Sequence, residues 1–151
     1  MAQIAKMEVQ TEIKSSPDKF YDIFRSKTHL MPKISPQHFK DVKFVEGDGK
    51  SVGSVRVWSY SASGNQETGK DTIEAIDDES KTITFNMLEG DLLKYYKTFK
   101  PILGISPLGQ GSLVKWTIEY ERQNESIPDP IKYKDFLTSW NKDVDAYLLN
   151  A

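Results

Sequence analysis

The sequence contains no cysteine, and this absence removes several classes of chemistry at once. Disulfides, thiolate metal sites and cysteine nucleophiles are all excluded. Histidine is scarce as well: His29 and His38 are the only two, and neither has a second ligand at metal-binding spacing. The sequence therefore predicts no metal site and no cofactor. The lack of disulfides is typical of a cytosolic protein.

Long apolar runs and an excess of positive charge are also missing. No segment approaches the ~18 apolar residues that a membrane span needs, and the first ten residues lack the apolar stretch of a signal peptide. Lysine and arginine number 20 against 22 aspartates and glutamates, which gives a formal net charge of −2. We therefore expect no nucleic-acid partner and no stable membrane insertion.

What the sequence does contain is an ordinary globular composition, with 38% hydrophobic and 28% charged residues. Its length of 151 residues fits one domain, residues 1–151, that is large enough to bury a substantial core. We expect this domain to be a monomer whose partner is a small molecule.

The stretch EGDGKSVGSV, residues 46–55, contains the Gly-Lys-Ser that ends a nucleotide-binding P-loop. In a P-loop another glycine lies five residues before the glycine of Gly-Lys-Ser, which is Gly49 here, but that earlier position is Phe44. A P-loop also leads into a helix, whereas SVRVWSYS, which follows, alternates and is rich in β-branched and aromatic residues. The pattern therefore predicts a loop between two strands and argues against nucleotide binding.

Alternating apolar and polar residues predict a strand over residues 5–13 and six more strands in series. These six are expected over 39–46, 54–61, 67–76, 81–88, 92–105 and 112–121. Because the connecting segments are short, the strands are expected to pair antiparallel.

Helical signals occur in three places. Ser16 and Pro17 supply an N-cap and a first-turn proline for a short helix, and a brief helical turn is predicted within residues 28–36. Apolar residues at three- and four-residue spacing over 133–148 predict one long amphipathic helix, with a cap in Pro128-Asp129-Pro130. The fold class is therefore α+β: a curved seven-stranded antiparallel sheet wrapped around a C-terminal helix.

The alternation does not decide which face of the strand over 54–61 points inward. One face carries Arg56, Trp58 and Tyr60, and the other carries Val55 and Val57. If the first face points inward, a cation and two polar-tipped aromatic side chains line the interior, as in a ligand pocket. In the alternative, the aromatic side chains only pack the core and Arg56 extends to an edge.

Several segments, in this order and spacing, resemble the plant major latex protein family. They are KSSPDKFYDIF, HLMPKISP, EGDGKSVGSVRVWSY, IEAIDDESKTITFNMLEG, YYKTFKPIL, GSLVKWTIEYE and DFLTSWNKDVDAYLL. This family is a branch of the superfamily named for the birch pollen allergen and the class-ten pathogenesis-related proteins. The resemblance covers essentially the whole chain.

The resemblance implies a helix-grip fold with two short helices after the first strand and a large hydrophobic cavity between sheet and helix. It favours the inward orientation of Arg56, Trp58 and Tyr60. By position, the expected ligand-binding residues are Phe20, Phe24, Met31, Ile34, Arg56, Trp58, Tyr60, Ile83, Phe85, Met87, Tyr96, Phe99, Phe136, Leu137, Trp140 and Val144.

Two parts of this expectation concern particular segments. The family's glycine-rich hairpin loop matches Gly47, Gly49 and Gly53. In the sixth strand the alternation is broken by adjacent tyrosines, so either Tyr96 with Thr98 or Tyr95 with Phe99 could point inward.

The resemblance implies a binding or carrier protein for hydrophobic or amphipathic small molecules, such as a lipid, sterol, hormone or specialised metabolite, in defence and stress responses. One alternative is a ligand-controlled signalling protein that docks a partner. Another is an enzyme of specialised metabolism, as some relatives are. For such an enzyme, Arg56, Lys70 and three tyrosines are available, but no inward carboxylate is recognisable, so no catalytic residue is predicted.

Overall fold

The structure, a computed structural model, describes residues 3–62 and 64–151. Its elements follow one another as β1 (Ala5–Ile13), α1 (Pro17–Ser26), η1 (Thr28–Leu30), α2 (Met31–Ile34), β2 (Phe39–Glu46), β3 (Val55–Ala62), β4 (Asn65–Asp77), β5 (Thr82–Gly90), η2 (Asp91–Lys94), β6 (Tyr96–Leu108), β7 (Gly111–Arg122) and α3 (Lys132–Leu149).

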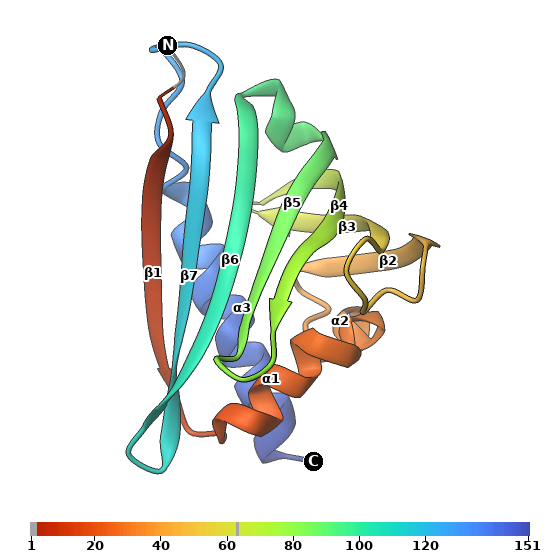
Figure 1. The fold of residues 1–151 in the computed structure, drawn as a ribbon, viewed down its shortest axis with the longest axis vertical. Helices are drawn as coiled ribbons and strands as arrows, with labels where there is room; N and C mark the ends of the chain where they lie inside the picture. The colour runs from red at the N-terminus through yellow and green to blue at the C-terminus, as the bar shows by residue number, and fades with distance from the viewer. Residues whose placement is uncertain (1–2, 63) are drawn as a thin grey trace.

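The seven strands form one antiparallel sheet in the order β1-β7-β6-β5-β4-β3-β2, so β1 and β2 are its edges. Consecutive strands from β2 to β7 are neighbours, as the short connections require. The sheet twists strongly, and α1 and α2 lie together at the end that also holds the C-terminus (Figure 1). The predicted fold class is confirmed.

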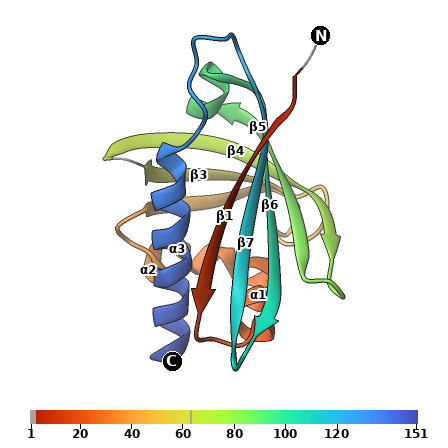
Figure 2. The ribbon, with the colours of Figure 1, turned by 90° about the vertical axis from the view of Figure 1, so that its left-hand side faces the viewer.

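Helix α3 runs along one side of the curved sheet (Figure 2), where it contacts β1 and β3. Between the helix and the sheet, the rings of Trp116 on β7 and Trp140 on α3 stack with their centroids 5.4 Å apart. Beside them the Trp116 indole N–H donates to Asn141, which in turn donates to Thr11 on β1. Near the C-terminal end of α3, the buried carboxylate of Asp145 accepts from the backbone N–H groups of residues 14 and 15. The helix is thus held by both apolar stacking and buried hydrogen bonds.

Helix α1 begins as its sequence predicts. The Ser16 hydroxyl accepts from the backbone N–H of Lys19, and Pro17 occupies the first turn, where its missing N–H has no cost. The buried face of the helix includes Phe20 and Phe24. This face closes one end of the space between the sheet and α3.

The predicted cap of the last helix is wrong in its details. Helix α3 begins at Lys132, and no side chain caps it. The Asp129 carboxylate instead accepts from the Tyr120 hydroxyl at 2.6 Å and from Arg122 at 3.2 Å. Because Asp129 pairs with β7, it fixes the connection that leads into the helix.

The start of the sixth strand also differs from the prediction. Residues Asp91–Lys94 form the 3-10 helix η2, and β6 begins at Tyr96. The pairing of β6 with β7 shifts register between Tyr96 and Thr98, as a β-bulge does. This extra residue turns both Tyr96 and Phe99 inward, each 4% exposed, while Tyr95 is 48% exposed. The structure therefore combines one residue from each of the two alternatives.

The glycine-rich segment forms the connection between β2 and β3. Gly47, Gly49 and Gly53 all have positive φ, between 75° and 91°, which other residues adopt only with strain. At Gly49 a side chain would also collide with the ring of Phe44. Two backbone N–H groups inside the loop, those of residues 50 and 51, donate to the Asp48 carboxylate. The loop is therefore built as a turn between strands.

Candidate ligand-binding site

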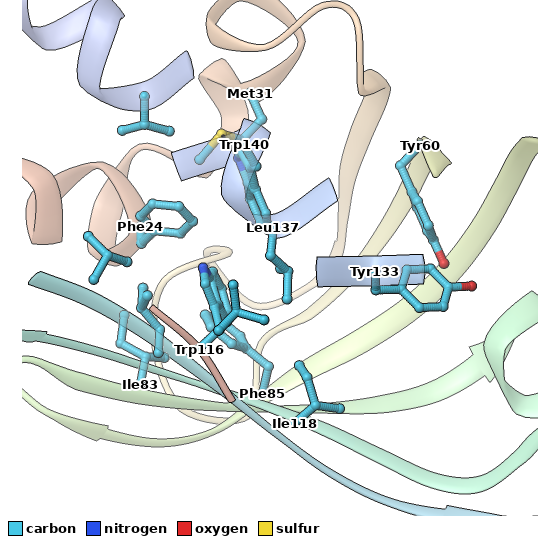
Figure 3. Packing of buried hydrophobic residues seen from close by; sticks show 14 of the residues in the cluster. Phe24, Met31, Tyr60, Ile83, Phe85, Trp116, Ile118, Tyr133, Leu137 and Trp140 are labelled. Atoms are coloured by element: carbon cyan, nitrogen blue, oxygen red, sulfur yellow. Dashed lines mark hydrogen bonds between the residues drawn. The ribbon is translucent and has the colours of Figure 1, made fainter. Parts of the chain in front are cut away.

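A cavity of about 100 Å³ lies between the sheet and α3. Side chains from strands β2 to β7 and from α3 converge on it, together with residues of α1, η1 and η2. Figure 3 shows part of this cluster, including Phe24, Phe85, Trp116 and Trp140. Its lining consists of Phe24, Thr28, Phe39, Arg56, Trp58, Tyr60, Asp71, Phe85, Met87, Leu92, Phe99, Pro101, Trp116, Ile118, Tyr133, Phe136, Leu137 and Trp140.

This volume is smaller than the large cavity that the family resemblance implies. Pockets for drug-sized ligands measure about 300–1,000 Å³. The difference lies in the aromatic side chains, because Trp140 packs against Trp116, Phe39 and Phe24 with ring centroids 4.7–5.4 Å apart. The rings reduce the space without filling it.

One wall of the cavity contains a buried ion pair between β3 and β4. The Arg56 guanidinium donates to both carboxylate oxygens of Asp71, at 3.0 and 2.9 Å, and also to the Thr28 hydroxyl at 3.3 Å. The rings of Trp58 and Phe85 each lie 5.0 Å from the guanidinium carbon. The pair is neutral as a whole and nearly inaccessible, with Arg56 1% exposed and Asp71 6% exposed.

A second polar group lies where the first turn of α3 approaches β3 and β4. The Glu67 carboxylate accepts from the hydroxyls of Tyr60 and Tyr133, at 3.0 Å each, and Glu67 is 7% exposed. Figure 3 shows these two hydroxyls close together at the same end of the aromatic cluster. Lys132 approaches the other carboxylate oxygen at 4.0 Å. This cluster ties α3 to the sheet.

The environment of these tyrosines disfavours their ionised form. Burial, followed by the negative charge of Glu67, raises the pKa of Tyr60 and that of Tyr133 well above the ordinary value. Burial and the hydrogen bond to Asp129 raise the pKa of Tyr120 to about 12. All three tyrosines therefore remain protonated donors at neutral pH.

These shifts predict that alkaline pH destabilises the fold. Tyrosines of the unfolded chain ionise near pH ~10, whereas the folded chain keeps these protons to higher pH. Above about pH 10 the free energy of unfolding should therefore fall, by up to about 1.4 kcal/mol per pH unit for each protected tyrosine. Urea unfolding at a series of pH values measures this slope. The slope should be shallower in Tyr133→Phe, and an identical slope in both proteins would contradict the assignment.

The sequence matches the model of the "Pathogenesis-related protein Bet v 1 family" over residues 2–151. The chain belongs to this family. Its relatives include MLP-like protein 31 of Arabidopsis thaliana, 37% identical over 96% of this chain and 86% of the relative. Major latex protein 149 of Papaver somniferum is 35% identical over 96% of this chain and 91% of the relative. The chain spans 44% of the longer MLP-like protein 28 of Arabidopsis thaliana. These relatives place it in the major latex protein branch.

Solved structures agree with this assignment of the Bet v 1 family fold. The crystal structure of ginseng major latex-like protein 151 from Panax ginseng has a TM-score of 0.92 and 39% identity, covering 95% of this chain and 97% of that one. Norcoclaurine synthase from Thalictrum flavum, in complex with dopamine and hydroxybenzaldehyde, has a TM-score of 0.83 at 19% identity, covering 99% and 88%. This second similarity concerns the fold alone.

In this Bet v 1 family member, the residues expected to bind ligand separate into two groups. One group of ten lines the cavity: Phe24, Arg56, Trp58, Tyr60, Phe85, Met87, Phe99, Phe136, Leu137 and Trp140. The other group is buried in the surrounding core, away from the cavity: Phe20, Met31, Ile34, Ile83, Tyr96 and Val144. The inward face of β3 is therefore the one with Arg56, and a role in ligand binding remains a prediction for the lining residues.

Sequence reasoning missed several lining residues, of which two groups matter most. Trp116 and Ile118 on β7 line the cavity but are not among the predicted site residues. The expectation that no carboxylate points inward is wrong, because Asp71 lines the cavity and Glu67 lies beside it. Conversely, Lys70 points outward, where its ammonium group lies 3.3 Å from Glu89.

The histidines have structural contacts. The ring of His38 lies 2.8 Å from the Ser139 hydroxyl on α3, and that of His29 packs edge-on against Phe44. Among residues 3–62 and 64–151, no cluster of three or more His, Cys, Asp or Glu side chains is placed to hold a metal ion. No helix within the same residues has the length and apolar character needed to cross a membrane.

Proposed function

We propose that this chain is an intracellular plant carrier or binding protein for hydrophobic or amphipathic small molecules, acting in defence or stress responses. The observation that carries the proposal is the aromatic cavity between the sheet and α3. Every buried side-chain nitrogen and oxygen among the described residues has a hydrogen-bond partner within the protein. An apolar guest therefore leaves no polar group of the wall without a partner.

The energy available from such a guest is sufficient for binding. Removing ~100 to 200 Å² of apolar ligand surface from water contributes roughly 2.5 to 5 kcal/mol at ~25 cal/mol per Å², before ordering costs. A ligand larger than the present cavity requires the aromatic rings or the start of α3 to move. We place access to the cavity beside Gly90 and η2, where Leu92 and Tyr133 form its wall.

A direct test adds bulk to the cavity wall and measures binding of a hydrophobic fluorescent dye. We expect the wild-type chain to bind one dye molecule, which an apolar compound displaces. Leu137→Phe should weaken dye binding several-fold, because the larger side chain occupies the cavity that Leu137 lines.

The matched control is Leu148→Phe on the same helix, which lies outside the cavity and should bind the dye as wild type does. Equal binding by both variants would mean that the dye binds elsewhere. Native mass spectrometry of protein from its natural source is an independent test. The proposal predicts a stoichiometric apolar adduct.

A catalytic function is a second candidate, and one observation favours it. Glu67 is a buried carboxylate hydrogen-bonded to two tyrosines at one end of the cavity, and general acid or base catalysis uses groups of this kind. To separate the two candidates, the purified protein is incubated with the compound that it binds, and mass spectrometry shows whether the compound has been converted. Recovery of the compound unchanged supports a carrier.

A further inference from the structure

The hydrogen bonds around Glu67 have a fixed direction. A carboxylate only accepts, so the hydroxyls of Tyr60 and Tyr133 must each donate their single proton to Glu67. The oxygen of each tyrosine keeps its capacity to accept. Because the rings of both tyrosines line the cavity, a guest that reaches this end meets acceptors and no free tyrosine donor.

Each nitrogen donor of the cavity wall named below has at least one acceptor within the protein. Arg56 donates three of its five N–H groups, one from each nitrogen, to Asp71 and Thr28, and the rings of Trp58 and Phe85 lie beside its guanidinium group. The indole N–H groups of the lining tryptophans also donate to neighbours: Trp58 to Asp71, Trp116 to Asn141 and Trp140 to Met31. Because an indole has a single N–H, an acceptor on the guest would have to break one of these bonds to pair with a lining tryptophan, and it finds no free tyrosine proton.

The charge of the cavity has the same consequence. Arg56 and Asp71 neutralise each other, whereas Glu67 has only Lys132 nearby, at 4.0 Å and with a side chain that is 46% exposed. A partly exposed pair at this distance is weak and is screened by solvent. The tyrosine end of the cavity is thus net negative and opposes an anionic guest.

From these contacts we infer that the cavity selects apolar molecules whose polar end is a hydrogen-bond donor, such as a hydroxyl or an amine, and discriminates against carboxylates and ethers. The inference rests on the proposed function and specifies its ligand class. In this arrangement Glu67 is a positioning residue: it orients both tyrosine protons away from the guest, and the tyrosine oxygens accept from the guest.

The test compares three compounds that share one apolar body. They are 4-propylphenol, which donates, 4-propylanisole, which only accepts, and 4-propylbenzoate, which is an anion. Calorimetric titration of the wild-type chain should show the phenol binding about tenfold more tightly than the anisole, with the benzoate weakest. Equal or tighter binding of the benzoate would overturn the inference.

The decisive variant is Glu67→Gln, which keeps the volume of the side chain. The new amide group can donate to a tyrosine oxygen and so frees a tyrosine proton to point at the guest. The preference for phenol over anisole should fall to within about twofold. If the variant folds and keeps the wild-type preference, Glu67 does not orient the tyrosines and the inference is wrong.

Tyr120→Phe is the matched control. It also breaks a hydrogen bond from a buried tyrosine to a carboxylate, Asp129, but Tyr120 does not line the cavity. Its preference should equal that of the wild type. Should Glu67→Gln fail to fold, the order of the three compounds on wild-type protein still decides. If none of the compounds nor the dye binds, the proposed function itself is wrong, whereas binding without preference overturns only the ligand class.

Discussion

Asp71→Ala is expected to lower the free energy of unfolding by about 3–5 kcal/mol, because it leaves the buried charge of Arg56 without a partner. Arg56 is 1% exposed and donates two of its hydrogen bonds to Asp71. The indole N–H of Trp58 loses its acceptor in the same substitution. Both groups are buried in the folded state, so both losses add to the cost.

Urea unfolding followed by tryptophan fluorescence measures this effect, and Glu74→Ala is the matched control. Glu74 is a carboxylate on the same strand, but its bridge to Lys100 is partly exposed, with side chains 41% and 36% accessible. Its removal should cost less than about 1 kcal/mol. Similar losses in the two variants would mean that burial of the Arg56 pair does not matter.

The double variant Arg56→Met with Asp71→Leu separates charge from packing. Since it removes both charges and keeps apolar volume, it should recover at least half of the stability that Asp71→Ala loses. A double variant as unstable as Asp71→Ala would attribute the loss to packing around Trp58 and Phe85.

The sequence allowed the faces of most strands to be predicted because their alternation is clear. On β5 and β7 most inward side chains are large and apolar, such as Phe85 and Trp116, and most outward ones are polar. On β3 the alternation is equally regular, but both faces carry apolar residues, so the orientation of Arg56 depended on the family resemblance. Burial of Arg56 at 1% exposure now fixes that orientation.

Strand β4 was harder to interpret because its inward residues near the cavity are Glu67, Gly69 and Asp71, which give no hydrophobic signal. The missing information was register. In the β3–β4 pairing, Asp71 lies directly opposite Arg56 and Glu67 directly opposite Tyr60. A hairpin with the observed register between the strands predicted over 54–61 and 67–76 would have placed both carboxylates beside their partners.

The volume of the cavity could not be predicted from the strand and helix pattern. It depends on how the rings of Trp140, Trp116 and Phe39 pack, which is a matter of side-chain conformation. The bulge at the start of β6 is a similar case, since one extra residue decides which side chains point inward. Elements and faces follow from periodicity, whereas the final shape of the site follows from packing.

Trp140→Ala should test this packing most severely. Trp140 stacks on Trp116 and contacts Phe39 and Phe24, so truncation should lower the free energy of unfolding by about 3–5 kcal/mol. Leu149→Ala, on the same helix but 54% exposed, should change it by less than about 0.5 kcal/mol. A loss below 1 kcal/mol in Trp140→Ala would mean that the rings around it collapse into the space.

If the space instead stays open, it should accept a guest of the deleted shape, because apolar cavities in proteins remain dry and bind small aromatic molecules. Indole at about ten times its dissociation constant for Trp140→Ala should then raise the melting temperature of this variant by about 3–6 °C. The same concentration should raise that of the wild type by less. Equal shifts in the two proteins would show that indole binds outside the space that Trp140 occupies. A larger shift in the variant would show that the ring of Trp140 limits the size of the guest. The aromatic packing around Trp140 would then both stabilise the protein without a ligand and restrict which ligands fit in the cavity.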